Sequence, residues 1–389
     1  MVNSVEPIVE AAGSRAEIQT PEAWQRLAKQ IASDPGVVLL IGASDAGKTT
    51  LGTFLLKAWG QMRIRVAFVD GDIGQSTLGP PTTIGLALFP PSGGIPPPPS
   101  PQPEPETITP LALRFVGSTS PAGHFLPLLV GLKRLVEKAC ELDARIILVD
   151  TTGLVHGAGG RELKFQKIDL LSPRHLVALQ RKGELESLLL PHRQRPGLLI
   201  HRLAVVEGVI NRSRDGRRAY RERKFQEYFQ NAHPLQVSLK EAWLHGFWFR
   251  GGRRLLTNEL NFLAKSLNAT VLYGELGPDS LDLLVSGGAS GDFFRVKAAF
   301  GVSDIRMTNL DDLRGLLLGL NNASNDTLAL GILQELDLRR ETLLCLTPLA
   351  DPKLPKLIQF GSLRIEPSGK ELGSFPLERG RSSVSSAPE

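Results

Sequence analysis

Residues 37–50 read VVLLIGASDAGKTT. The opening VVLLIG is a continuous apolar run, which is typical of a strand buried on both faces of a parallel sheet. Residues 42–49 fit the pattern of a phosphate-binding loop, and residues 49–59 are expected to form the helix that follows. Because the loop stands directly between a strand and a helix, the stretch predicts a nucleotide site rather than a glycine-rich helix cap.

The residue types in this loop suit the phosphates of ATP and a metal ion. Its glycines let backbone amides and the helix N-terminus face the phosphates. Lys48 is expected to neutralise the β and γ oxygens, and the Thr49 hydroxyl to ligate Mg²⁺. We therefore expect ATP and Mg²⁺ as cofactors, with a nucleotide site formed by Gly42, Ala43, Ser44, Asp45, Ala46, Gly47, Lys48, Thr49 and Thr50.

Two further apolar runs end in aspartate, VAFVD at 66–70 and ARIILVD at 144–150. Loops at the carboxyl edge of an open α/β sheet carry functional groups. Asp70 and Asp72 are therefore candidates to hold the metal, directly or through water, and Asp72 also to accept a proton from an attacking hydroxyl. The alternative is that these residues only form a turn at the strand end.

The third run continues as VDTTG at 149–153. This resembles the switch-type loop that senses the γ-phosphate in P-loop proteins. We expect Asp150 and Thr151 to contact the substrate there.

Positive charge gathers in one segment, NRSRDGRRAYRERK at 211–224. Its six arginines and one lysine oppose one aspartate and one glutamate, so its balance of +5 equals the net charge of the whole chain. Arg217 and Arg221 are four residues apart, and on a helix they would share one face and could close over a transferring phosphate. The alternative is a solvated, charged helix face.

The composition and apolar periodicity of the remaining sequence predict its organisation. Ten of the 21 residues at 90–110 are proline, which predicts an extended solvated insertion and leaves a proline-rich ligand for a partner as the alternative. Helices are expected at 21–31 and 126–142. We expect a nucleotide-binding domain over 21–232, a smaller β-rich domain over 233–376 with one helix near 311–320, and flexible tails at 1–20 and 377–389.

Composition excludes several classes of protein. Apolar residues make up 42% and charged residues 22%, which excludes wholesale disorder. Two cysteines cannot build a disulfide framework, so a reducing, cytoplasmic setting is the default. The sequence lacks the apolar run of a membrane span and the features of a signal peptide.

Two groups of side chains are read as structural. His124, His156, His175 and His201 lack metal-ligand spacing, which favours packing or turn roles. An aromatic group precedes a set of arginines, and an aromatic core is favoured over stacking on bases. This group comprises Trp243, Phe247, Trp248 and Phe249, followed by Arg250, Arg253 and Arg254.

Six blocks in order resemble the polynucleotide 5′-hydroxyl kinase family, which includes the kinase subunit of the pre-mRNA cleavage complex and nucleolar kinases of rRNA processing. The blocks are GASDAGKTT, DGDIGQSTLGPPTTIGLAL, FVGSTSP, DTTGLVHGAGG, KIDLLSPRHLVALQR and RSRDGRRAYRERKFQEYF. The resemblance to this family is concentrated in residues 36–232. It implies a P-loop NTPase fold with a mainly parallel sheet, and transfer of the ATP γ-phosphate to the 5′-hydroxyl of RNA, which is favoured, or of DNA.

The resemblance also implies roles for individual residues. Asp72 would act as general base with Gln75 near it, and Arg217 and Arg221 would belong to an arginine-rich lid over 211–229. A clasp over the substrate would fall on residues 79–83, including Thr82 and Thr83. The sequence GPPTT there departs from the family's Pro-Gly pattern. Only about 35 residues precede the loop, so we expect no N-terminal β domain like that of eukaryotic members.

Two rival functions remain open at this point. One is an ATP-bound, non-catalytic assembly subunit of an RNA-processing complex, for which the proline-rich insertion and the basic helix would be docking surfaces. The other is an NTPase switch that hydrolyses its nucleotide and has no acceptor hydroxyl. Neither rival involves a membrane.

Overall fold

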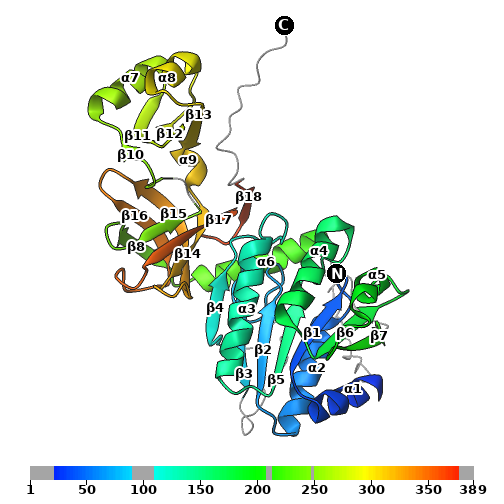
Figure 1. Cartoon of the computed structure of the whole chain (residues 1–389). Coiled ribbons are helices and arrows are strands. Elements are labelled where there is room, and N and C mark those ends of the chain that lie inside the picture. The colour runs from blue at the N-terminus through cyan, green and yellow to red at the C-terminus, as the bar shows by residue number, and fades with distance from the viewer. Residues whose placement is uncertain (1–21, 90–108, 207–212, 247–248, 376–389) are drawn as a thin grey trace, which may run out of the picture.

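The computed structural model describes residues 22–89, 109–206, 213–246 and 249–375. Three sheets follow one another along the molecule (Figure 1). A seven-stranded sheet holds the phosphate-binding loop, a second seven-stranded sheet lies next to it, and a four-stranded sheet lies at the far end. The predicted α/β fold with a smaller β-rich C-terminal part is confirmed.

The nucleotide-binding sheet has the order β4-β3-β2-β5-β1-β6-β7. Its strands are β1 (Val37–Gly42), β2 (Val66–Gly71), β3 (Thr83–Phe89), β4 (Ala112–Phe115), β5 (Ile146–Thr151), β6 (His175–Gln180) and β7 (Leu199–Ala204). Five of them, β2, β5, β1, β6 and β7, pair in parallel, whereas β3 and β4 are antiparallel to their neighbours. The carboxyl ends of β1, β2 and β5 therefore meet at one edge.

Helices cover both faces of this sheet. One face carries α1 (Glu22–Ser33) and α2 (Lys48–Gln61), and the other carries α3 (Phe125–Glu141), α4 (Gly157–Leu171), α5 (Glu186–Leu189) and the short η1 (Leu190–His192). Alternate residues of β1 point to opposite faces, since Leu39 packs with α3 and α4 whereas Leu40 packs with α1 and α2. This double burial explains the unbroken apolar runs of the sequence.

The C-terminal part contains two sheets. The nearer one has the order β18-β17-β14-β15-β16-β8, with β9 pairing β17 in parallel. Its strands are β8 (His233–Ser238), β9 (Trp243–His245), β14 (Leu316–Asn321), β15 (Thr327–Asp337), β16 (Thr342–Thr347), β17 (Leu357–Ile365) and β18 (Glu371–Ser374). The four-stranded sheet comprises β10 (Arg253–Arg254), β11 (Thr270–Leu276), β12 (Ser280–Ser286) and β13 (Asp304–Asn309), accompanied by α7 (Thr257–Leu267) and α8 (Phe293–Phe300).

The helix predicted near 311–320 is wrong. Only α9 (Leu310–Leu313) is helical there, and Leu316–Asn321 forms strand β14. This strand is fully buried between β15 and β17, so its residues are apolar on both faces and show no strand alternation. The expectation of one helix in this part is also wrong, because α7 and α8 cover the four-stranded sheet.

Helix α6 (Arg214–Phe229) joins the nucleotide-binding part to the C-terminal part (Figure 1). Its buried residues Phe225 and Phe229 pack in one cluster with Phe115 of β4 and with residues of β14, β15 and β17. The Phe115 ring lies so close to Gly319 that a Cβ there would be 2.6 Å from it. Across the same junction, Arg114 pairs with Asp326 at 3.1 Å. The two parts are therefore packed together at the base of α6.

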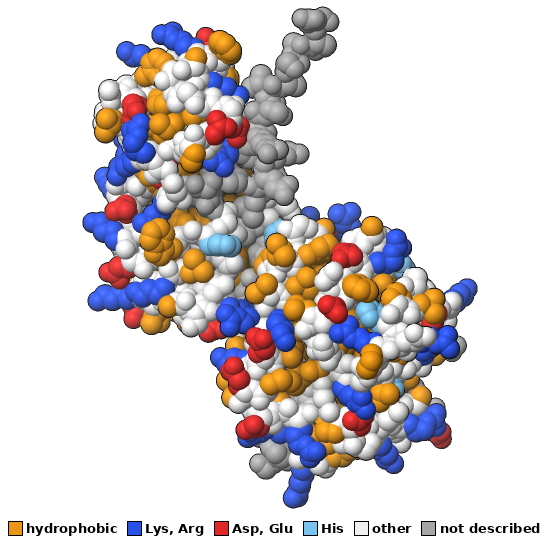
Figure 2. Space-filling view, viewed as in Figure 1, with side chains coloured by type: hydrophobic (Ala, Val, Ile, Leu, Met, Phe, Trp, Pro, Cys, Tyr) orange, Lys and Arg blue, Asp and Glu red, His pale blue; other side chains and the backbone are white. Residues whose placement is uncertain are grey.

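Surface charge is interspersed on the face shown in Figure 2, where basic and acidic side chains occur over both parts. Among the described helices, none has the length and apolar character needed to cross a membrane. The predicted tails and most of the proline-rich insertion at 90–110 lie outside the described residues.

The aromatic residues that follow β8 occupy two different environments, one buried and one exposed. Phe249 is 4% exposed and packs edge-on against Tyr273, with 5.7 Å between ring centroids, as expected of a core residue. Trp243 is 63% exposed, so the core reading is wrong for this residue; its ring lies under the Arg250 guanidinium at 5.0 Å. Residues 247–248 lie outside the described chain.

Candidate active site

The loop after β1 has the backbone shape of a phosphate cradle. Asp45 and Gly47 adopt left-handed conformations with φ of 55° and 83°. Gly47 is the N-cap of α2, and in the described part of the chain no side chain caps this helix. Open amides at a helix N-terminus bind phosphate. Lys48 is 6% exposed, and its Nζ donates to the Ala43 carbonyl at 2.8 Å.

The end of β5 lies directly against this loop. Thr49 Oγ1 donates to Asp150 Oδ2 at 2.8 Å, and Asp150 Oδ1 accepts from the Thr151 amide at 2.7 Å. Burial raises the pKa of the Asp150 carboxyl. The chain then passes so near the cradle that a Cβ at Gly153 would lie 2.3 Å from Ser44 Oγ. The structure thus brings the two predicted substrate residues of β5 next to the nucleotide loop.

Asp70, at the end of β2, organises the loop that follows it. Its Oδ2 accepts hydrogen bonds from the amides of Thr77 and Leu78 and from the hydroxyls of Thr77 and Ser76. Burial, together with the negative charges of Asp150 and Asp72, raises the pKa of the Asp70 carboxyl to about 6 although backbone hydrogen bonds oppose the shift. Metal binding by Asp70 remains a prediction, since a metal would compete with these donors.

Asp72 faces the site from the same loop. Its Oδ1 accepts from the amides of Gly74 and Gln75 at 3.0 and 3.1 Å. The side chain is half-buried, and Oδ2 has no hydrogen-bond partner in the described part of the chain. Gln75 Nε2 donates to the Gly74 carbonyl at 3.0 Å and reaches the Arg217 carbonyl at 3.5 Å. The predicted Asp72–Gln75 loop therefore lies under the first turns of α6.

The two threonines of the predicted clasp are fully buried. Thr83 Oγ1 donates to the Pro80 carbonyl at 2.7 Å. Thr82 is held at φ of 75°, and its amide donates to the Ile73 carbonyl at 2.9 Å. Substrate contact by Thr82 and Thr83 stays a prediction; in this structure the Thr83 hydroxyl supports the loop from inside, whereas the buried Thr82 hydroxyl has no hydrogen-bond partner in the described part of the chain.

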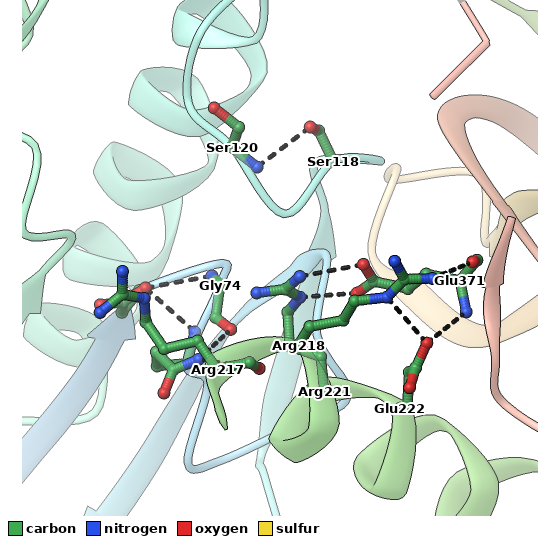
Figure 3. A network of polar contacts seen from close by, with 10 residues as sticks. Gly74, Ser118, Ser120, Arg217, Arg218, Arg221, Glu222 and Glu371 are labelled. Carbon is green, nitrogen blue, oxygen red and sulfur yellow. Dashed lines mark hydrogen bonds and ion pairs between the residues drawn. The ribbon is translucent and has the colours of Figure 1, made fainter. Parts of the chain in front are cut away.

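Arg217 and Arg221 of α6 have different partners, and Figure 3 shows the pair that Arg221 forms with Glu371. Arg217 Nη1 pairs with Asp45 of the phosphate-binding loop at 3.2 Å. One turn later, Arg221 forms a bidentate pair with Glu371 of β18, with Nε–Oε1 and Nη2–Oε2 distances of 2.6 and 2.9 Å. The predicted lid helix thus touches the nucleotide loop at its start and the C-terminal sheet one turn further on.

Two buried lysines of the site were not expected. Lys164 Nζ donates to Thr151 Oγ1 at 2.8 Å and to the Thr152 carbonyl at 2.6 Å, which fixes the end of β5. Lys167 is fully buried, and its Nζ has no hydrogen-bond partner in the described part of the chain. Burial lowers the pKa of both lysines, that of Lys167 to about 8. The signal in the sequence is two lysines three residues apart on the apolar face of a helix.

Charge at the site suits a divalent cation bound together with phosphates. The negative charge of Asp72 contributes to the raised pKa values of both Asp70 and Asp150, and Thr49 Oγ1 lies beside the Asp150 carboxylate. No cluster of three metal-ligating side chains occurs among the described residues. Mg²⁺ is usually bound by one or two protein oxygens together with substrate phosphates, so the donor set fits this ion.

The histidines lie outside the site. His175 is fully buried and forms hydrogen bonds with His201 Nε2 at 2.9 Å and with the Asp34 carbonyl at 2.7 Å. His124 and His156 precede α3 and α4 as N-caps. The packing and turn roles expected for them are therefore observed.

A strand–loop–helix cradle at the edge of a parallel sheet, with a lysine and threonine opening α2, defines a P-loop nucleotide-binding protein. Residues 42–231 match the family described as mRNA cleavage and polyadenylation factor CLP1 P-loop. The chain is 31% identical over 341 residues to a polyribonucleotide 5′-hydroxyl-kinase of Methanocaldococcus jannaschii, covering 87% of this chain and 90% of that one. It therefore belongs to the polyribonucleotide 5′-hydroxyl-kinase family, as the six sequence blocks predicted.

Other relatives support this family assignment, and one solved structure supports the fold. A kinase of the same name from Pyrococcus furiosus is 30% identical, with 92% of this chain and 96% of that one covered. The Clp1 kinase of Gallus gallus is 29% identical but matches only 49% of this chain and 44% of its own length. The solved structure of a Clp1p–Pcf11p complex has a TM-score of 0.55 at 13% identity, covering 89% of this chain and 80% of that one, and supports the fold.

Proposed function

We propose that this chain transfers the γ-phosphate of ATP to the 5′-hydroxyl end of RNA, using Mg²⁺. The observation that supports this most directly is the meeting of three elements at one sheet edge: the P-loop, the Asp72 loop and the start of α6. A subunit that only binds ATP needs only the first of these. A kinase also needs a group that accepts the proton of the acceptor hydroxyl and cations that neutralise the transferred group.

Each group has a role that its contacts support. The amides of residues 42–49 and Lys48 would hold the triphosphate, with Lys48 leaving the Ala43 carbonyl for the phosphate oxygens. Mg²⁺ would be held by Thr49 together with oxygens of the phosphates and would neutralise phosphate charge. Asp72 is oriented by two backbone amides through Oδ1, so its Oδ2 is directed to accept the proton of the 5′-hydroxyl.

Specificity for RNA is supported by the names of the relatives from Methanocaldococcus jannaschii and Pyrococcus furiosus, which specify polyribonucleotides. The nucleic acid would approach the edge that the Asp72 loop and the first turns of α6 form together, where Arg217 and Arg221 lie one turn apart. A cytoplasmic location fits the scarcity of cysteine.

The test uses ATP labelled at the γ-phosphate with 5′-hydroxyl RNA and DNA oligonucleotides of the same sequence. Labelled RNA is the expected product, formed faster than labelled DNA. Lys48→Ala is expected to lower turnover by at least about a hundredfold, because the charge that the phosphate-binding loop itself places on the β and γ oxygens is lost. Lys57→Ala, an exposed lysine of the same helix, is the matched control.

Three results would contradict the proposal in different ways. Free labelled phosphate without labelled oligonucleotide would identify an NTPase switch. ATP binding with neither product would identify a non-catalytic assembly subunit. Equal labelling of both oligonucleotides would contradict only the preference for RNA.

A further inference from the structure

The backbone of the turn between β17 and β18 packs closely against α6. Gly369 has φ of 88°, and a Cβ there would lie 2.5 Å from the Glu222 carbonyl oxygen and 2.6 Å from the Gln226 amide. At the next contact, the Glu371 amide donates to Glu222 Oε1 at 3.0 Å. The Glu371 carbonyl accepts from Arg218 Nη2 at 2.6 Å. The first residue of β18 is thereby fixed on the helix before its side chain is considered.

The Glu371 side chain in turn fixes Arg221 (Figure 3). Both carboxylate oxygens accept from the guanidinium, through Nε and Nη2. The two side chains are only 10% and 16% exposed, so solvent screens the pair weakly. A bidentate contact of this kind sets the plane of the guanidinium. It leaves Nη1 without a partner in the described part of the chain, so one edge of Arg221 remains open.

We propose that Glu371 is a positioning residue for phosphoryl transfer, because it holds Arg221 with its open edge directed to the substrate phosphate. This inference rests on the proposed function. Arg217, on the same face of α6 and one turn earlier, already reaches the P-loop through Asp45 at 3.2 Å. Arg221 is thus the next cation along the helix from the nucleotide.

The physical gain is preorganisation. A free arginine side chain loses rotamer entropy when it is immobilised, and a misplacement of about 1 Å can cost about a hundredfold in rate. Glu371 removes both costs before the substrate arrives. The carboxylate comes from the C-terminal sheet, so the active site is completed by a residue 150 positions away in sequence.

The experiment measures turnover of ATP and 5′-hydroxyl RNA by the full chain. Glu371→Gln keeps the shape and loses the charge, so kcat is expected to fall about ten- to a hundredfold, with KM for ATP changed less than about threefold. Glu371→Asp keeps the charge on a shorter side chain and is expected to lie between Glu371→Gln and wild type. Glu366→Gln is the matched control, because Glu366 lies in the same turn and its side chain pairs, within the described residues, with Lys370 and Ser368 alone.

A double variant separates positioning from general structural damage. If Glu371 acts through Arg221, adding Glu371→Gln to Arg221→Ala should slow the reaction less than about twofold further. An additive loss would overturn the inference. So would a Glu371→Gln variant at wild-type rate, or a faster one, which would mean that the pair withholds Arg221 from the substrate. A wild-type protein that labels no oligonucleotide would instead refute the proposed function and this inference with it.

Discussion

Asp72 is the residue on which the proposed chemistry depends most. Asp72→Asn keeps the size of the side chain and the two amide contacts to its Oδ1, but it removes the proton-accepting oxygen. We expect turnover to fall at least about a hundredfold while ATP affinity changes little, as a general base requires. Single-turnover labelling and equilibrium ATP binding measure the two quantities. If affinity fell in step with turnover, Asp72 would chiefly hold the metal, and Asp70→Asn would need the same comparison.

The buried charge of Lys167 is expected to lower the free energy of unfolding. Burial lowers its pKa from 10.5 to about 8, so between these pH values the unfolded chain binds more protons than the folded chain. The free energy of unfolding therefore rises with pH across this window, and the full cost of the buried charge is present below pH 8. At 1.36 kcal/mol per pKa unit, this cost is about 3 kcal/mol.

We therefore predict that Lys167→Met raises the unfolding free energy at pH 7 by up to about 3 kcal/mol and lowers phosphorylation, because the site loses a cation. Urea unfolding at pH 7 and near pH 10 measures the change, and the advantage should shrink at the higher pH. Arg161→Met, at an exposed position of α4, is the control. A variant less stable than wild type at pH 7 would show that the ammonium has a partner that stabilises it.

Prediction from sequence succeeded at this scale where the geometry is local. The strand, loop and helix around Lys48 are contiguous, so their pattern fixes the placement of Lys48 and Thr49. The partner of Arg221 could not be predicted, because Glu371 is brought to it by a sheet formed far along the chain. Lys164 and Lys167 were missed because a lysine on an apolar helix face is identified as a site residue only when its neighbours are known.

At the scale of elements, α6 combines two functions in one helix. Arg217 and Arg221 face the nucleotide loop and β18, whereas Arg223 pairs within the helix with Glu227 at 3.7 Å. We expect Arg217→Ala and Arg221→Ala to lower kcat by about 10³-fold, by analogy with arginine fingers, and to change RNA affinity less. Arg223→Ala should leave kcat near wild type.

The salt dependence of RNA affinity distinguishes RNA binding by these arginines from their effect on kcat. Each RNA phosphate neutralised by a basic residue contributes about −0.7 to the slope of log affinity against log salt for a single strand. Titrations of RNA at several salt concentrations would give this slope for wild type and for each variant. Equal and small effects of all three variants on kcat would show that α6 is only a solvated charged face.

Strand β14 shows the limit of prediction for elements. The run Leu316-Leu-Leu-Gly-Leu320 is apolar at every position except glycine, and a buried helix and a central strand share that pattern. The structure resolves the ambiguity because β15 and β17 pair with both edges of the strand. Pairing of this kind is a tertiary property, which no window of sequence contains.

At the scale of the whole molecule, Phe115 holds the nucleotide-binding part to the C-terminal part. Its ring fills the space left by glycines 319 and 361, and it packs against Phe225 and Phe229 of α6. We expect Phe115→Ala to lower the free energy of unfolding by about 3–5 kcal/mol, as for other buried phenylalanines. Urea unfolding followed by tryptophan fluorescence measures it, with the exposed Leu126→Ala as control. A change below about 1 kcal/mol would mean that the two parts do not depend on this contact.

The attachment of α6 at its far end also has a mechanical consequence. The helix has 16 residues, so at about 1.5 Å per residue it is about 24 Å long. Phe225 and Phe229 anchor one end in the C-terminal core, and the other end carries Arg217 over the P-loop. A tilt of about 5° at the anchored end would shift the far end by about 2 Å, enough to break its contact with Asp45. The helix is therefore a lever, through which a tilt of the C-terminal sheet would move Arg217 relative to the P-loop.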